Sequence, residues 1–499
     1  MCFIRLLHHH FINLYGGIPP WFGSSCLIVL LRRLCASVFT CSETPSSLVP
    51  IHSSASMANA DSVSVRIFSL NCWGIRYLSK HCPERYRMLG QLLSKENHDL
   101  ILLQEVWSEK DFLYLKQKLA SSHLHSHYFK SGVIGSGLAI FSKHRIHDTF
   151  LYRYSLNGYP YMAHHGDWFG GKAVAMAVIS LGSLTANVYV THLHAEYSRD
   201  KDSYLPHRVV QAWELQQFIR HTSVGADVVI LGGDLNMHPQ DLGNRLLRSY
   251  TGLRDAYLET AKFDGCEDGI TLIADNPFIC KNGLAPFEKG IRIDYILFKG
   301  SPKTGIHCDS MSTTKGSVPN HPFPYSDHEA LTAQLRLESH VPAEAGDDRQ
   351  LKTHNFNAGN LAELVDIMTE ARTEVKVGLH CAERMRYTAA RTGVMGLALL
   401  FLELVIAAVP WLALGAEQPF PSTSFYLLAA LCFAILLTTS LLYIFYTMEV
   451  KSLQGAEDQM RLAVGSLQEK LRGFHASQPL SDPQKPPEGP GPGAFDPEE

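Results

Sequence analysis

Residues 227–238, DVVILGGDLNMH, set the strongest limit on how this chain can fold. The first half is an apolar, β-branched run of strand length bounded by glycines, which predicts a strand buried on both faces. Asp234 and Asn236 follow at positions i and i+2, so both side chains leave the same side of an extended backbone at the carboxyl end of the strand. A carboxylate beside an amide suits a phosphate-and-metal site, but the same spacing is common in turns that cap a helix.

Other strand-like runs also end in polar residues of matching type, which favours a site over a simple turn. RIDYIL places Asp294 inside a run that would otherwise be wholly apolar. Asn71 ends the run RIFSLN, and Glu105 ends LILLQE. His192 and His194 lie in VYVTHLHAE, and Asp327 and His328 lie in YSDH.

Six of these motifs, taken in chain order, carry a family resemblance. They resemble motifs of the endonuclease/exonuclease/phosphatase superfamily, and in this chain they read SLNCWG, LLQEVW, THLHAE, GGDLNMHP, RIDYIL and SDHEAL. This resemblance implies an α/β, deoxyribonuclease-I-like fold, in which two packed sheets are flanked by helices and the site lies at one end of the sandwich. The strings NCWGIRYLSKH, NGYPY, HHGDWF, THLHAEY and PHRV resemble the membrane-anchored neutral sphingomyelinases of vertebrates. The likeness covers residues 63–337 and extends to a C-terminal membrane hairpin.

The resemblance implies a metal site built on Glu105. Glu105 would be the principal ligand, with Asn71 and Asn236 holding metal, water or phosphate, and Asp327 near the metal side. Such oxygen ligands suit Mg²⁺ better than zinc, so Mg²⁺ is the expected cofactor. Asp234 would help to orient the nucleophile.

His328 is the expected general base of this site. A neutral imidazole is well matched to taking a proton near pH 7, and a carboxylate on its other nitrogen fixes the tautomer. The resemblance assigns that orienting role to Asp294, and places His192 on the scissile phosphate or the leaving oxygen. His194 and the pair His164 and His165 are more simply explained as structural residues.

Substrate contacts are expected in the segment that follows residue 151. Asn157 and Lys172 are the candidate substrate-binding residues, although Lys172 can equally be a solvated loop lysine. Residues 152–169 are rich in aromatic rings, and such rings attract quaternary ammonium groups. A choline pocket, a contact with the membrane and ordinary core packing all remain open for these rings.

The resemblance implies hydrolysis of sphingomyelin to ceramide and phosphocholine, with lysophospholipids such as lyso-platelet-activating factor as further substrates. The alternatives are an endonuclease or inositol-phosphate phosphatase of the same fold, and a catalytically idle membrane scaffold. Residues 63–340 carry nearly equal numbers of basic and acidic side chains, whereas dedicated nucleic-acid binders carry a basic excess. A membrane lipid is therefore the expected partner rather than nucleic acid, and the oligomeric state stays open.

Cysteine usage argues for a reducing compartment. The chain has 11 cysteines without a C-x-x-C pair, so neither a disulfide framework nor a zinc site follows. A cytosolic catalytic domain is therefore expected.

Strand-like runs alternate with amphipathic segments from residue 63 onward, which predicts an α/β catalytic domain over residues 63–340. The apolar stripe within residues 204–221 indicates core packing. The predicted strands are 65–71, 100–105, 137–142, 173–181, 185–192, 228–232, 291–298 and 329–337, and the predicted helices are 83–95, 109–120, 204–221 and 240–247.

Residues 393–414 and 425–446 are apolar runs of 22 residues each, long enough to cross about 30 Å of hydrocarbon. Two such runs buried in a soluble domain would need a larger core than this tail supplies. Glu403 is costly in lipid, so it should face the partner helix or be protonated. Basic residues before and after the pair place both ends in the cytosol, on an internal membrane such as the endoplasmic reticulum.

The remaining segments are expected to be appendages. Residues 1–62 form an extension with little order that lacks the pattern of a signal peptide, and Met57 is an alternative start. Residues 341–392 should be a linker followed by a juxtamembrane helix. Residues 447–499 should be a cytosolic tail whose proline-, glycine- and acid-rich end is disordered.

Overall fold

The computed structural model describes residues 62–279, 284, 287, 289–339, 358–414 and 422–476. All of these residues belong to one compact unit, Asn59–Glu499. The predictions made for the N-terminal extension before residue 62, the linker 341–357, the loop 415–421 and the end of the tail after residue 476 lie outside the described residues.

Two β-sheets form the centre of the region that precedes the linker. A short two-stranded sheet of β11 (Leu272–Ile273) and β12 (Gly290–Ile291) accompanies them. The first sheet has the order β10 (Phe263–Asp264), β14 (Thr304–Thr313), β15 (Leu331–Ser339), β1 (Val63–Asn71), β2 (Leu100–Gln104), β4 (Leu138–Ser142) and β3 (His125–Phe129). The second has the order β5 (Ile146–Arg153), β6 (Ala173–Leu181), β7 (Leu184–His192), β8 (Val228–Asp234), β13 (Asp294–Gly300) and β9 (Arg254–Asp255).

The two sheets share one hydrophobic core. Every residue of β2 and of β8 is buried, as expected of apolar strands covered on both faces. Ile67 and Leu102 of the first sheet and Ile230 of the second are fully buried in this core. Burying one such side chain contributes about 1.5–3 kcal/mol.

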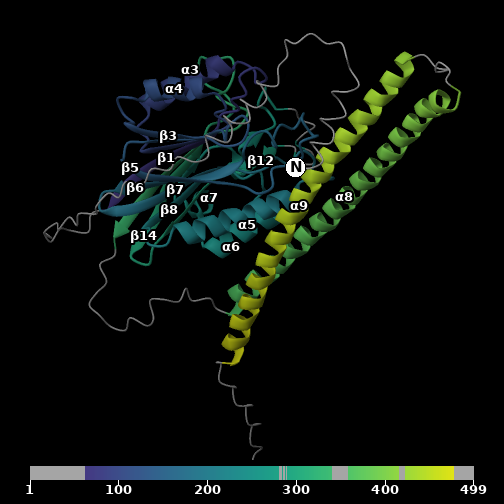
Figure 1. Ribbon diagram of the computed structural model, residues 1–499. Helices are drawn as coiled ribbons and strands as arrows, with labels where there is room; N and C mark the ends of the chain where they lie inside the picture. The colour runs from purple at the N-terminus through teal and green to yellow at the C-terminus, as the bar shows by residue number, and fades with distance from the viewer. Residues whose placement is uncertain are drawn as a thin grey trace, which may run out of the picture. The chain divides into compact units, whose positions relative to one another are not determined.

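Helices cover the outer face of each sheet (Figure 1). α3 (Cys82–Lys95) and α4 (Glu109–Lys118) pack on the first sheet, and α5 (Leu205–Thr222) and α6 (Leu242–Thr251) pack on the second. The short helices α7 (Ala256–Glu259) and η1 (Glu267–Gly269) lie in the connection that leads to β13. The predicted α/β sandwich of two sheets flanked by helices is therefore confirmed.

Several strand predictions differ from the structure. β3, β5 and β14 were not predicted, because polar residues interrupt the apolar positions of each strand. The two-residue strands β9, β10 and β11 were not predicted either. The predicted strand 291–298 is interrupted after β12, and Asp294 begins β13 rather than lying inside a strand. The Thr271 hydroxyl accepts the N–H groups of Ile293 and Asp294 at this break, each at 3.2 Å.

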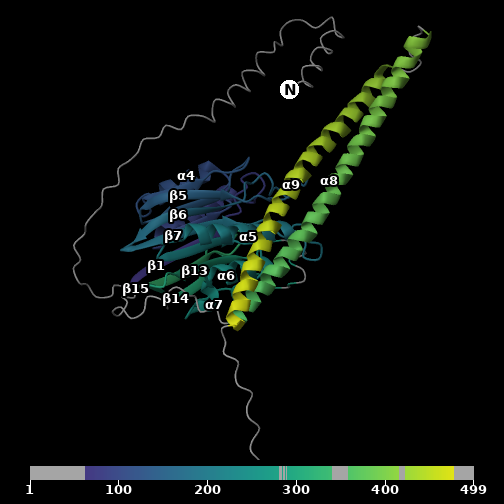
Figure 2. The ribbon, with the colours of Figure 1, turned by 60° about the horizontal axis from the view of Figure 1, so that its bottom comes forward.

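Two long helices follow the sandwich. α8 (Ala358–Leu414) has 57 residues and α9 (Ser422–Ala476) has 55, so each continues without a break from the expected span into the adjoining segment. α8 packs against α5 and α6, and α9 packs against α5 (Figure 2). Trp213 of α5 and Leu246 of α6 are buried against α8 and α9 residues that include Met368 and Leu453.

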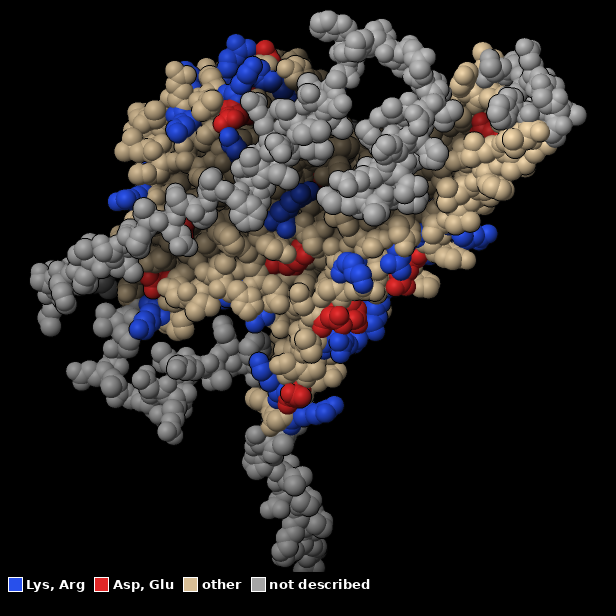
Figure 3. Space-filling view, viewed as in Figure 1, with Lys and Arg blue, Asp and Glu red and all other residues tan. Residues whose placement is uncertain are grey.

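The other half of each long helix is apolar and exposed. Both helices are long and apolar enough to cross a membrane, and only 11 % of the most apolar window of each is buried. Figure 3 shows charged side chains over the end of the hairpin near α5 and α6, and almost none over the other end. Glu403 is buried against α9, where it lies beside Cys432, as predicted for a carboxyl group in this position.

Candidate active site

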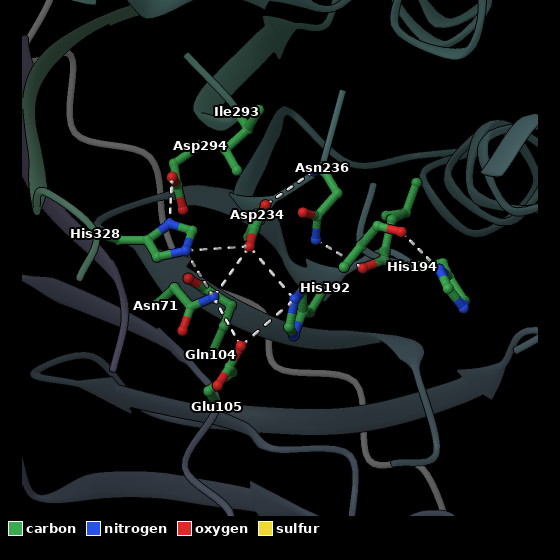
Figure 4. A network of polar contacts seen from close by, with 12 residues as sticks. Asn71, Gln104, Glu105, His192, His194, Asp234, Asn236, Ile293, Asp294 and His328 are labelled. Atoms are coloured by element: carbon green, nitrogen blue, oxygen red, sulfur yellow. Dashed lines mark hydrogen bonds and ion pairs between the residues drawn. The ribbon is translucent and has the colours of Figure 1, made fainter. Parts of the chain in front are cut away.

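Strand register brings the predicted polar residues together. β7 runs parallel to β8 with His192 opposite Asp234, and β13 runs antiparallel to β8 with Asp294 opposite the same residue. In the other sheet, Asn71 lies opposite Gln104, the residue before Glu105. We call the resulting group of six the polar cluster (Figure 4): Asn71, Glu105, His192, Asp234, Asp294 and His328.

The backbone after β8 differs from the extended conformation predicted for it. Gly233 has φ 154°, and a Cβ atom there would lie 2.1 Å from the carbonyl oxygen of Thr191, so only glycine allows this approach of β7 and β8. Asn236 is left-handed, with φ 48°, and its N–H donates to Asp234 Oδ1 at 2.9 Å. Asp234 and Asn236 therefore form a local turn at the polar cluster, but this turn does not cap a helix, because the N-cap residue of α6 is Asp241.

Glu105 has a second unusual backbone conformation. Its φ is 54°, a left-handed value that is rare for residues other than glycine and asparagine. The carbonyl oxygen of Glu105 accepts the N–H of Gly74 at 3.0 Å, and its carboxylate accepts Trp107 Nε1 at 3.4 Å. Because such conformations cluster at functional sites, this strain supports a role for the Glu105 side chain.

Asn71 joins the two sheets at the centre of the cluster. Its Nδ2 atom donates to Glu105 Oε1 at 3.1 Å and to Asp234 Oδ2 at 3.0 Å, and lies 3.5 Å from His328 Nε2 (Figure 4). Its own Oδ1 atom accepts the N–H of Trp73 at 3.0 Å. A buried amide therefore holds two carboxylates from different sheets close to one histidine.

His328 and Asp294 form a buried pair. His328 Nδ1 lies 2.8 Å from Asp294 Oδ2, which directs Nε2 toward Asn71 and Asp234. Burial alone would lower the pKa of His328, but the adjacent carboxylates of Asp294, Asp327 and Asp234 together raise it well above its ordinary value. The imidazole therefore has a strong affinity for a proton.

The two aspartates of the cluster are shifted in opposite directions. Burial raises the pKa of Asp294, and His328 only partly offsets this. Burial acts in the same direction on Asp234, but the hydrogen bond and charge of His192, with His328 and Lys172, hold the pKa of Asp234 well below its usual range. Asp234 is thus kept ionised while Asp294 shares a proton with His328.

Lys172 lies within the site and is buried. Its Nζ atom is 2.9 Å from His192 Nε2, and it donates to the carbonyl oxygen of Leu193 at 2.9 Å. It also forms an ion pair with Asp167 at 2.9 Å, and the charges of Lys172 and His194 outweigh burial to lower the pKa of Asp167. The alternative of a solvated loop lysine is therefore wrong.

Asp167 was missed as a site residue. It lies five positions before Lys172 in the string HHGDWFGGK, and it also accepts a hydrogen bond from Tyr197. An aspartate in a loop before a strand carries no distinctive spacing. Only the fold reveals that it forms an ion pair with a buried lysine beside His192.

The other predicted residues lie around this centre. Asn236 Nδ2 donates to the carbonyl oxygen of Leu193 at 2.9 Å, so its amide borders Lys172 and His192. Ser326 Oγ donates a hydrogen bond to Asp327 Oδ1 at 3.1 Å, and burial raises the pKa of Asp327 to about 6. Asn157 Nδ2 donates a hydrogen bond to the carbonyl oxygen of Tyr154 at 2.8 Å, so this side chain stabilises the conformation of its own loop.

Several aromatic rings of residues 152–169 pack against other elements. Tyr152 stacks on Phe218 of α5, and Tyr154 is buried in the same core. Tyr161 bonds Tyr446 of α9 through their hydroxyl groups at 2.9 Å. His165 stacks on Tyr197, and its Nδ1 atom lies 2.7 Å from the Tyr204 hydroxyl.

The donor set of the polar cluster fits a divalent cation with oxygen ligands. The Glu105 side chain is 16 % exposed, which leaves its carboxylate open to an ion, whereas Asp234 beside it is buried and ionised. The amide of Asn71 contacts both carboxylates. Carboxylate and amide oxygens are ligands that hard cations prefer.

A second group of possible ligands is already occupied by an arginine. Glu196, His238 and Asp241 have ligand atoms within 4.8 Å of one another. Arg199 bonds Glu196 at 2.9 Å and Asp241 at 2.7 Å, so its guanidinium supplies the positive charge at this place.

The polar cluster and its neighbours Lys172 and Asn236 combine three chemical abilities. The His328–Asp294 pair can take a proton, the Glu105 side can hold a cation, and Lys172 with His192 and Asn236 can face an anionic group. Hydrolysis of a phosphate ester needs all three.

Known proteins resemble this chain over most of its length. A model of the Endonuclease/Exonuclease/phosphatase family matches residues 68–328. Sphingomyelin phosphodiesterase 2 of Mus musculus is 47 % identical over 404 residues, which are 80 % of this chain and 92 % of that protein. The Homo sapiens protein of that name is 46 % identical over 408 residues, 82 % of this chain and 93 % of that protein. An inositol phosphosphingolipids phospholipase C of Schizosaccharomyces pombe is 32 % identical over 295 residues, 55 % of this chain and 69 % of that protein.

The matched region and the geometry agree. Residues 68–328 begin within β1 and end at His328, so they contain all six members of the polar cluster. The likeness to the two mammalian proteins extends over 80 % or more of the chain, which is more than the sandwich alone. The chain therefore belongs to the endonuclease/exonuclease/phosphatase family and, within it, to the group of neutral sphingomyelinases.

Proposed function

We propose that this protein hydrolyses sphingomyelin to ceramide and phosphocholine with Mg²⁺ as its cofactor. The observation that carries the proposal is the polar cluster, in which a proton-accepting His328–Asp294 pair lies beside Glu105 and Asp234. The relatives named sphingomyelin phosphodiesterase match along 80 % or more of the chain and support the choice of lipid.

His328 is the proposed general base. Nε2 of the neutral imidazole accepts a proton from a water molecule whose oxygen attacks phosphorus, while Asp294 stabilises the imidazolium through Nδ1. The bond between phosphorus and the ceramide oxygen breaks, and that oxygen takes a proton from solvent. Asp234 orients the attacking water.

Three further side chains are proposed to face the phosphate. Lys172 and His192, whose nitrogens lie 2.9 Å apart, supply positive charge and a hydrogen-bond donor for its non-bridging oxygens. Asn236 contributes its amide from the neighbouring turn. We propose that Asn157 acts indirectly, by shaping the loop that leads to Lys172.

Glu105 is the proposed main metal ligand, with Asn71 and Asp327 on the same side. A bound Mg²⁺ would stabilise charge on the phosphate oxygens and favour the neutral form of His328. The partly open carboxylate of Glu105 leaves room for the water molecules that Mg²⁺ retains.

We propose that residues 393–414 and 425–446 span an internal membrane, such as the endoplasmic reticulum. Basic residues adjoin both spans on the side of α5 and α6, which favours a cytosolic catalytic domain. In sealed vesicles, added protease should then cut both the segment near Asp347 and the tail near Pro486. Protection of either segment would contradict this topology.

A substrate panel tests the proposed reaction. The purified full-length protein should release phosphocholine from sphingomyelin in detergent micelles, and lose this activity when EDTA replaces Mg²⁺. The same panel should contain lyso-platelet-activating factor, phosphatidylcholine, a soluble inositol phosphate and duplex DNA. Preference for either of the last two would support a phosphatase or a nuclease, and activity on no substrate would support a scaffold.

A further inference from the structure

A patch of exposed apolar side chains borders the polar cluster. Tyr77 is 95 % exposed and Leu78 is 80 % exposed in the loop between β1 and α3, and Val133 is 73 % exposed in the loop between β3 and β4. Together with Ile75 and Ile134 we call them the rim patch. Soluble surfaces rarely gather such residues without a partner.

Three residues of the rim patch line a groove whose other lining residues include Gly74 and Trp107, both hydrogen-bonded to Glu105. The groove has a volume of about 630 Å³, and Ile75, Tyr77, Trp107 and Ile134 line it. Trp107 donates to the Glu105 carboxylate, and the backbone beside Ile75 is bonded to Glu105 through Gly74. The patch is therefore part of the mouth of the site.

The long helices show which way this mouth faces. Tyr446 is the last residue of the second apolar span, and Glu449 just after it bonds His207 in the first turn of α5 at 3.0 Å. Farther along α9, Gln459 bonds Trp213 in the middle of α5 at 2.9 Å. α9 thus runs along α5 as it leaves the span.

The start of α5 lies at the end of the sandwich that carries the site, because it follows the His192 end of β7. Its last residue, Thr222, accepts a hydrogen bond from Asn187 near the start of β7 at 2.9 Å. Residues of α9 that lie farther from the span therefore lie farther from the polar cluster. The end of the sandwich that carries the polar cluster is therefore the end nearer the apolar spans.

The rim patch is also joined to the hairpin through one loop. The N–H groups of Val133 and Ile134 donate to the carbonyl oxygen of Phe169 at 3.1 and 3.2 Å. Tyr161, in the same loop as Phe169, bonds Tyr446 at the edge of the span. A surface continuous with a membrane edge is suited to a lipid bilayer.

We propose that the rim patch lies against the lipid bilayer, so that a phospholipid reaches Glu105 through the adjacent groove without leaving the membrane. This inference rests on the proposed hydrolysis of a membrane lipid. Tyr77, Leu78 and Val133 are the residues in contact with lipid.

Photocrosslinking tests the contact directly. A benzophenone amino acid is placed at position 77 in the full-length protein, which is reconstituted in vesicles of phosphatidylcholine and sphingomyelin. The matched control carries it in place of Val224, which is 84 % exposed at the opposite end of β8. We expect lipid adducts at position 77 and few at position 224. Equal labelling at both positions, absence of adducts at 77, or a crosslink to a second copy of the chain would overturn the proposal.

A kinetic comparison separates the surface from the chemistry. The double variant Leu78→Asp, Val133→Asp should lose at least about tenfold in activity on sphingomyelin in vesicles, because charged side chains weaken membrane contact. It should retain wild-type activity on a water-soluble, short-chain sphingomyelin, as should Val224→Asp on both substrates. Equal losses on both substrates would overturn the role of the rim patch. If wild type cleaves neither substrate, the proposed function fails, while the crosslinking result still decides whether the patch meets lipid.

Discussion

The polar cluster and the contact between α5 and α9 both bury ionisable side chains, but they use them differently. In the cluster, Asp234 contacts Asn71, His192 and His328. The backbones of Glu105 and of the nearby Asn236 are left-handed. At the α5–α9 contact, the side chains of His207 and Glu449 are 1 % and 3 % exposed and form one hydrogen bond at 3.0 Å.

The difference indicates what each buried group does. Gly158 donates its N–H to His207 Nδ1 at 3.1 Å, so Nε2 carries the hydrogen that is donated to Glu449. Both side chains of this pair are almost fully buried, so the pair has no open position for a ligand, although Glu449 Oε2 has no hydrogen-bond partner. The cluster instead contains Glu105, whose side chain is 16 % exposed. We therefore expect substitutions in the cluster to change rate, and substitutions at the helix contact to change stability.

Glu105→Ala should have the largest effect. Loss of the main ligand removes electrostatic stabilisation of several kcal/mol, so turnover should fall by about 10³ or more. The thermal midpoint should stay near that of wild type, because the side chain is partly exposed. Retained activity at ordinary Mg²⁺ with normal melting would contradict the assignment of Glu105.

His328→Ala and Asp294→Asn test whether the buried pair acts as one unit. Removal of a general base costs about 10² to 10⁴ in rate, and Asp294→Asn should cost less because an imidazole remains. Since both changes act on one proton transfer, their losses should overlap in the double variant.

The measurement is kcat for wild type, both single variants and the double variant on sphingomyelin micelles. Fully multiplicative losses would assign Asp294 to packing or to the metal. An unaffected His328→Ala would remove the general base from the mechanism. Membrane attachment serves as the control, because the long helices lie far from both residues in the chain.

The sequence predicted the members of the cluster better than their geometry. Apolar runs that end in Asn71, Glu105, His192 and Asp234 follow from local pattern, because buried strands need such runs. The left-handed backbones of Glu105 and Asn236 depend on partners from other strands, so local sequence could not reveal them. Asp167 was missed for the same reason, since its partner Lys172 becomes buried only in the folded chain.

The long helices were predicted as separate pieces for a different reason. Sequence composition changes sharply near residue 393, where charged residues give way to an apolar run. That change reflects the surroundings of the helix rather than its backbone, and α8 continues through it. Prediction of membrane spans from composition therefore says little about where a helix begins or ends.

Glu449→Leu should affect stability rather than rate. The substitution keeps an apolar volume but leaves His207 Nε2–H without an acceptor, at a cost of about 1.5–3 kcal/mol for a lost bond to a charged group. The melting midpoint of the full-length protein in micelles should fall by about 2–4 °C. At 25 °C, kcat should stay within about twofold of wild type. Glu449→Gln keeps an acceptor and should be milder, and a rate loss without a change in melting would contradict this division of roles.

Glu370→Ala should give the smallest effect, and it tests whether burial is what makes the helix contact matter. Arg245 of α6 and Glu370 of α8 form an ion pair across the same two groups of helices, but their side chains are 33 % and 56 % exposed. Water screens both partners whether or not they meet, so the pair should contribute only about 0.2–1 kcal/mol.

The salt dependence of melting provides the decisive comparison between the two pairs. The small destabilisation by Glu370→Ala should disappear at about 1 M salt, where exposed charges are screened within about 3 Å. The loss caused by Glu449→Leu should persist there, because it comes from an unpaired N–H in a buried position. If Glu370→Ala destabilises as much as Glu449→Leu, then charge rather than burial holds the long helices against the catalytic domain, and the contrast drawn between the two pairs is wrong.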